Sequence, residues 1–246
     1  MTGKPTVAAH NRHGDDSGEA ESAGAGETAT NAASHNLAAT LAAMDGTRRA
    51  LHILDALTEL GFDAVTAAIA RLDVAARDEL ARSLGTIADR GSASLLVHLL
   101  ADPEGFVRET AAGAIGHTGE PAAADALLPL VDSPNHNIRK AAAFSLGELQ
   151  VGAAVDSLLT MTGDPNPAVR AAAATALGKI GGGMDTEPLL QLLDDPYPDA
   201  AQMAAWTLGE LRDPRAAPAL ERAANSKDAA LARIAGAALA KLQREM

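Results

Sequence analysis

Apolar residues recur at helical spacing along most of this chain, and from residue 72 onward they also recur in columns 31 residues apart. The clearest columns are Leu84, Ile115, Leu146, Leu177, Leu208 and Leu239, and then Leu96, Leu127, Leu158, Leu189 and Leu220. An interval of this length accommodates two helices and two tight turns. The period therefore predicts an all-α array of helix pairs, in which each pair buries its apolar face against the next.

Proline, glycine and alanine occupy fixed places in each repeat. The prolines are Pro103, Pro134, Pro165 and Pro196, and the glycines are Gly85, Gly116, Gly147, Gly178 and Gly209. Proline in the first turn is typical of a helix start, and glycine is typical of a helix end. Alanine columns that include Ala142 and Ala173 predict that neighbouring helices approach closely.

The sequence before residue 73 does not follow this period and divides into two parts. Residues 1–36 are polar or small, and Val7 is the only Val, Ile or Leu among them, so we expect a disordered tail. Residues 37–72 carry a helical stripe that includes Ile53, Leu57 and Leu60, and we expect an N-terminal helical cap. Residues 73–246 then form the array, with five repeats and a terminal helix.

Composition narrows the class of protein further. Hydrophobic residues make up 47% of the 246 residues and aromatic residues only 2%, which favours closely packed helices with an alanine-rich core. A formal net charge of −12 argues against non-specific binding to nucleic acid or to an anionic membrane surface. There is no cysteine and no apolar run long enough to span a bilayer, so we expect a cytoplasmic protein.

The repeat signature, D-P-x-x-x-V-R-x-x-A-A-x-A-L-G-x-I, resembles the short HEAT-like repeat named after phycobilisome lyases. The resemblance extends from Leu72 to the C-terminus. It implies a right-handed α-solenoid, a superhelix of HEAT-like helix pairs.

An arginine column follows the proline column and consists of Arg77, Arg108, Arg139 and Arg170. A basic ladder is compatible with an anionic ligand. The resemblance implies instead a structural role, in which each arginine pairs with an acid of an adjoining repeat. The candidate acids are Asp102, Asp164 and Asp195.

An acidic column lies near the start of the second helices, at Asp125, Asp156 and Glu187. Acids in a first turn stabilise the helix dipole. The resemblance implies that these helices line the concave face, where the acids would present a ladder to a basic protein partner.

The first helices carry a variable ridge that we expect to face outward. Most of its positions are polar, including Gln202, Glu148 and Glu210, yet Phe144 and the single tryptophan, Trp206, interrupt it. Exposed aromatic side chains on a rigid array are candidate anchors for a protein partner. The alternative is that the tail or a neighbouring helix covers them.

Catalytic and cofactor motifs are absent from the sequence. There is no Gly-x-Ser-x-Gly elbow, no phosphate-binding loop and no second pair of residues to complete a metal site, so no cofactor is expected. Deoxyhypusine hydroxylases are iron enzymes built on similar repeats, but their His-Glu dyads would follow the arginine column. This chain has Glu109, Lys140 and Ala171 after its arginines.

Two functions remain. The first is a non-enzymatic adaptor that presents an extended surface to another protein, and the resemblance suggests a setting in prokaryotic signalling or complex assembly. The second is a subunit of a bilin lyase or a bilin chaperone, which the resemblance alone supports, and the scarcity of aromatic residues counts against it. The partner and the oligomeric state stay open.

Overall fold

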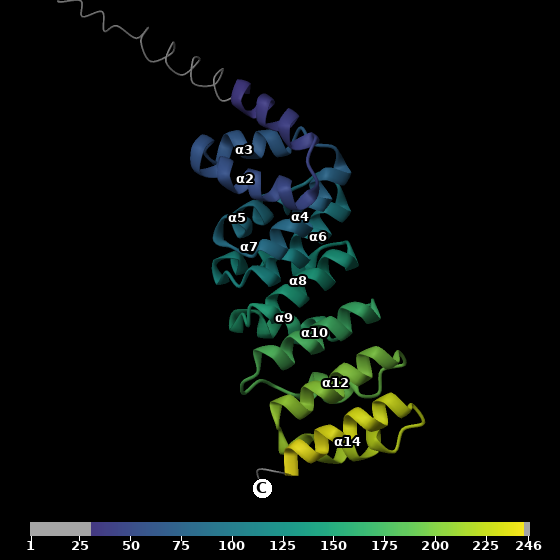
Figure 1. The fold of residues 1–246 in the computed structure, drawn as a ribbon. Coiled ribbons are helices and arrows are strands. Elements are labelled where there is room, and N and C mark those ends of the chain that lie inside the picture. The colour runs from purple at the N-terminus through teal and green to yellow at the C-terminus, as the bar shows by residue number, and fades with distance from the viewer. Residues whose placement is uncertain (1–30, 244–246) are drawn as a thin grey trace, which may run out of the picture.

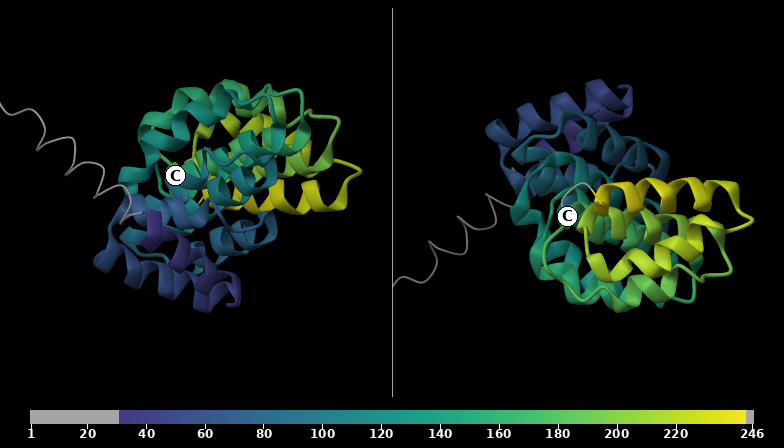
Figure 2. Two further views of the ribbon diagram at one scale, coloured as in Figure 1. Left: turned by 90° about the horizontal axis from the view of Figure 1, so that it is seen from above. Right: turned by 90° about the horizontal axis from the view of Figure 1, so that it is seen from below.

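The computed structural model describes residues 31–243 and shows an elongated stack of helices that runs from the N-terminal to the C-terminal end (Figure 1). Viewed along the stack, successive helix pairs are rotated relative to one another (Figure 2). No strand occurs in the described part of the chain. The fold is therefore the all-α solenoid that the repeat period predicts.

Three helices precede the regular array: residues 31–42, α2 (Gly46–Leu60) and α3 (Phe62–Ile69). Asp45 caps α2, and Gly61, with a φ of 81°, makes the turn into α3. Residues 31–36 lie in the first of these helices, so the expectation of a disordered tail up to residue 36 is wrong for them. Leu37 and Leu41 are buried against the cap, which explains why the helix forms. Residues 1–30 lie outside the described part of the chain.

The array consists of alternating first and second helices. The first helices are α4 (Val74–Ile87), α6 (Gly105–Ile115), α8 (His136–Glu148), α10 (Pro167–Ile180), α12 (Pro198–Leu211) and the terminal α14 (Ala229–Gln243). The second helices are α5 (Arg90–Leu99), α7 (Ala124–Leu127), α9 (Val155–Met161), α11 (Glu187–Leu192) and α13 (Ala217–Ala224). Short 3-10 segments accompany three of the second helices: η2 (Pro121–Ala123) and η3 (Leu128–Asp132) flank α7, η4 (Gly152–Ala154) leads into α9, and η5 (Pro214–Ala216) leads into α13. A further one, η1 (Gly116–Thr118), continues α6.

The proline column does not start the first helices as expected. Pro134 and Pro165 lie two residues before the helix, and Asn135 and Asn166 are the caps, each accepting a hydrogen bond from the N–H two residues on at 2.9 Å. The prolines therefore fix the loop before the cap, where their missing N–H has no cost.

The glycine column does not end the helices as expected but lies where neighbouring first helices meet. A methyl group on Gly147 would lie 2.6 Å from the Cα of Ala176 in the next first helix, and one on Gly209 would lie 2.7 Å from the Cβ of Ala238. These glycines lie within α8 and α12, and they let adjacent first helices come into backbone contact.

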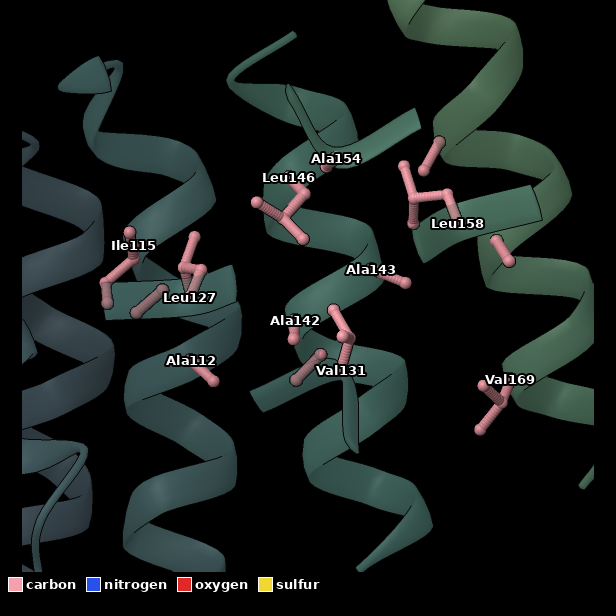
Figure 3. Packing of buried hydrophobic residues seen from close by; sticks show 14 of the residues in the cluster. Ala112, Ile115, Leu127, Val131, Ala142, Ala143, Leu146, Ala154, Leu158 and Val169 are labelled. Carbon is pink, nitrogen blue, oxygen red and sulfur yellow. The ribbon is translucent and has the colours of Figure 1, made fainter. Parts of the chain in front are cut away.

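The core lies between the two helix layers. Figure 3 shows Ile115, Leu127, Leu146 and Leu158 gathered there with the alanines of the first helices. All four of these large side chains are fully buried. The 31-residue apolar columns thus form one continuous core along the stack.

The two layers pack differently along the stack. Consecutive first helices contact one another extensively, whereas consecutive second helices share few contacts. The first helices are also the longer ones, and they carry the glycine and alanine columns that let them approach closely. The expectations that the second helices line the concave face and that the aromatic ridge faces outward stay predictions. We call the surface formed by the first helices the first-helix face and the surface formed by the second helices the second-helix face.

Candidate functional site

Three of the four column arginines form ion pairs with the aspartate 25 residues further on. The Nε–Oδ2 distances are 2.6 Å for Arg77–Asp102, 2.7 Å for Arg139–Asp164 and 2.6 Å for Arg170–Asp195. In each pair Nη2 also donates to Oδ1, so the contact is bidentate. The third donor, Nη1, binds a backbone carbonyl near the start of the same repeat, such as that of Ser133 for Arg139, at 2.8 Å. These arginines join one repeat to the next, as the resemblance implies.

The environment of the pairs favours the charged form of both the arginine and the aspartate. Hydrogen bonding to Asp164 raises the pKa of Arg139 above its usual value. Burial raises the pKa of Asp164, but hydrogen bonds from Arg139 and from the N–H of Asn166 outweigh burial, so its pKa lies below the ordinary value. The charged form of each pair is thus the stable one.

Arg108 differs from the other column arginines. Its Nη1 donates to the carbonyl oxygens of Asp102 and Pro103, the latter at 2.9 Å. The position 25 residues on is Ser133, and Arg108 forms no ion pair within residues 31–243.

The acidic column lies on the second helices. Asp125, Asp156 and Glu187 are exposed and occupy the first turns of α7, α9 and α11. Their position suits the helix dipole. They belong to the second helices, whereas the aromatic ridge belongs to the first helices.

Phe144 lies on α8, one of the first helices. Its ring is half-buried and meets His117 edge-on, with 5.4 Å between the centroids, and Lys179 Nζ lies 5.5 Å from its centroid. Two grooves flank it. One, of about 550 Å³, includes Arg82, Thr86 and His117 in its lining, and the other, of about 410 Å³, includes Glu109, Lys140 and Ala172.

Gly113 explains the hollow beside Phe144. It lines both grooves, and a methyl group added to it would meet nothing within 4 Å. The corresponding ridge positions in other repeats carry larger side chains, namely Arg82, Phe144, Thr175 and Trp206. Gly113, His117 and Lys140 were not among the candidate site residues. A glycine in a ridge column is the signal that could have identified the groove.

Trp206 has a different environment. It is half-buried on α12, and a methyl group on Gly178 of α10 would lie 2.6 Å from its Cζ3 atom. The indole therefore lies against the preceding first helix. This contact matches the alternative that a neighbouring helix covers part of the ring.

The polar ridge residues mainly join neighbouring repeats. Glu148 pairs with Lys179, and Glu210 pairs with Lys241. Gln202 donates to Asp228 at 3.1 Å. The ridge is thus braced by contacts between side chains of adjoining repeats.

Within the described residues, no group of three or more histidines, cysteines, aspartates or glutamates could hold a metal ion. No helix in the same span is both long and apolar enough to cross a bilayer.

Comparison with known proteins gives repeat proteins of this fold. A crystal structure of an engineered protein aligns at 21% identity and a TM-score of 0.58, covering 79% of this chain and 96% of that one. A designed armadillo repeat protein in complex with peptide (KR)4 aligns at 19% identity and a TM-score of 0.56, covering 78% and 98%. The complex of CpcE and CpcF of phycocyanin lyase from Nostoc sp. PCC7120 aligns at 22% identity and a TM-score of 0.48, covering 87% and 88%, too low a score to support an argument about function.

No curated protein matches the chain. The family model for HEAT repeats matches residues 62–143, 126–188 and 186–245, which together span most of the chain. This match agrees with the helix pairs, the arginine–aspartate contacts and the solenoid described above. The chain belongs to the HEAT repeat family.

Proposed function

We propose that this protein is a non-enzymatic adaptor that binds a segment of another protein along its first-helix face, around Phe144. The observation that carries the proposal is the pair of grooves on either side of a half-buried phenyl ring. Aromatic side chains beside a hollow are typical anchors of protein interfaces.

The framework around Phe144 supports this role. The ring is held between His117 and Lys179, and Lys179 is itself tied to Glu148. Because these contacts fix the ring before a partner arrives, little side-chain entropy is lost on binding. The designed armadillo repeat protein that aligns with this chain is in complex with the peptide (KR)4, which supports peptide binding by a solenoid of this kind.

Site-specific crosslinking tests the proposal directly. The chain has no cysteine, so a single Gly113→Cys variant takes a photoreactive label at one place, in the open space of the groove. Asp156→Cys, at an exposed position on the second helix α9, is the matched control. We expect the label at residue 113 to crosslink a defined protein in an extract of the native cells, and the label at residue 156 to leave that protein free.

Two results would contradict the proposal. Crosslinking from residue 156 and not from residue 113 would move the interface to the acidic column. A coloured tetrapyrrole that purifies with the protein and occupies the groove would replace the adaptor with the bilin-lyase alternative.

A further inference from the structure

The ladder of arginine–aspartate pairs lacks one aspartate. The 25-residue spacing that joins each column arginine to its aspartate also joins Arg108 to Ser133, and in the last repeat it joins Ala201 to Ser226. In the last repeat both the arginine and the aspartate have been replaced. Arg108 is therefore the one arginine of this column, within the described residues, that is kept without its carboxylate.

The guanidinium of Arg108 is held as in the paired repeats. Its Nη1 donates to two carbonyl oxygens near the start of its own repeat, as the Nη1 of Arg139 and of Arg170 also does. The other two donors, Nε and Nη2, have no acceptor in the span from residue 31 to residue 243. In Arg139 and Arg170 these same two atoms bind the carboxylate at 2.6–2.9 Å.

In this repeat, the backbone N–H that binds the aspartate in the paired repeats belongs to Asn135. The N–H of Asn135 donates to Ser133 Oγ at 3.3 Å, whereas the corresponding N–H groups donate to Asp164 and Asp195 at 2.8 Å. A methyl group on Gly105 would lie 3.6 Å from Arg108 Nη2 and 3.7 Å from Asn135 Nδ2, so both donors border the same small space.

We propose that Arg108, Ser133 and Asn135 form a binding site for one anionic oxygen group, a carboxylate or a phosphate, carried by a bound molecule. The paired repeats show that this arrangement of donors holds a carboxylate in bidentate fashion. Charge-assisted contacts to arginine of this kind are strong and geometrically specific. The site is independent of the grooves around Phe144, because it uses none of their lining residues.

Thermal unfolding in different anions tests the site. We would compare sodium phosphate and sodium acetate with sodium chloride at equal ionic strength, using the full chain. We expect at least one of the two oxyanions to raise the Tm of the unmodified protein by about 2–4 °C. That rise should vanish in Ser133→Asp, which supplies the missing carboxylate, and in Arg108→Gln.

The control is Arg48→Gln, which removes an arginine that pairs with Asp45 on the exposed surface, and it should keep the full rise. If Arg108→Gln does not fold, Ser133→Asp still tests the site, because we expect this variant to fold and to have a higher Tm in chloride than the unmodified protein. A rise with acetate alone would identify a carboxylate ligand, and a rise with phosphate alone would identify a phosphate ligand. Equal rises in the unmodified protein and in Ser133→Asp, or no rise with either anion, would overturn the proposal.

Discussion

The two helix layers come from the same repeat and yet differ in regularity. The first helices of the array have 11 to 15 residues, and glycine and alanine columns bring them into backbone contact. The second helices have 4 to 10 residues, and 3-10 segments adjoin three of them. The difference teaches that the first helices form a tightly packed layer, whereas the second helices form a looser layer that mainly covers the core.

The largest expected effect comes from opening the core between the layers. Leu146 is fully buried, so Leu146→Ala should lower the free energy of unfolding by about 2–5 kcal/mol through lost burial and a cavity. Urea unfolding measures the loss. Leu51→Ala, at a side chain that is 51% exposed, is the control and should cost less than about 0.5 kcal/mol. A similar small cost for both would mean that the layers do not share a tight core.

A methyl group on Gly147 tests the close contact within the first layer. Gly147→Ala places that group 2.6 Å from the Cα of Ala176, so the helices must shift, at a cost of about 1–3 kcal/mol. The matched control is Gly113→Ala in the same layer, where nothing lies within 4 Å. It should be neutral or stabilise by up to about 1 kcal/mol, because alanine favours the helix. Equal behaviour of the two variants in thermal unfolding would refute the close contact.

Replacing Trp206 should have an effect between that of Leu146→Ala and that of the exposed control Leu51→Ala. Its ring covers Gly178 but is not fully buried. Trp206→Ala should lower the free energy of unfolding by about 1 kcal/mol, measured in urea. A loss as large as that of Leu146→Ala would make Trp206 a core residue.

Acid should weaken both layers through their carboxylates. Hydrogen bonds from Arg215 and Thr186 lower the pKa of Asp213 to about 2, and this aspartate joins two repeats of the second layer. Its charged form is favoured in the folded state. The stabilisation is therefore complete above the unfolded pKa of about 3.9 and is lost as the pH falls toward 2.

Asp213→Asn should reduce the fall in Tm between pH 5 and pH 2, because one of the titrating groups is then absent. The change should be small, since the pKa values of the ladder aspartates Asp102, Asp164 and Asp195, which lie in the loops before first helices, are also lowered. An unchanged pH dependence would show that Asp213 is not held as described.

The sequence predicts the architecture well, because a strict period carries most of the information. The helix pairs and the apolar columns follow from residues 31 apart, and the resemblance to HEAT-like repeats implies the arginine–aspartate contacts. The role of the glycine column does not follow from the period, because Gly147 stands where a helix end is expected and is instead a contact point between first helices.

The candidate site was predicted only in part, for a related reason. Phe144 was identified as an anomaly in a polar column, but the grooves beside it exist because Gly113 lacks a side chain. A missing side chain carries little weight in a sequence pattern. Trp206 appeared equivalent to Phe144, and only the contact with Gly178 separates the two residues.

The most direct test of the central claim, that the first-helix face binds the partner, is the Kd of a crosslinked partner for two variants. Phe144→Ala removes the ring between the grooves, and a combined Asp125→Ser, Asp156→Ser and Glu187→Gln variant neutralises the acidic column of the second helices. The account predicts at least a tenfold weaker Kd for Phe144→Ala, about 1.4 kcal/mol or more, and a change within about twofold for the acidic-column variant. A tenfold loss for the acidic-column variant with an unchanged Kd for Phe144→Ala would contradict it.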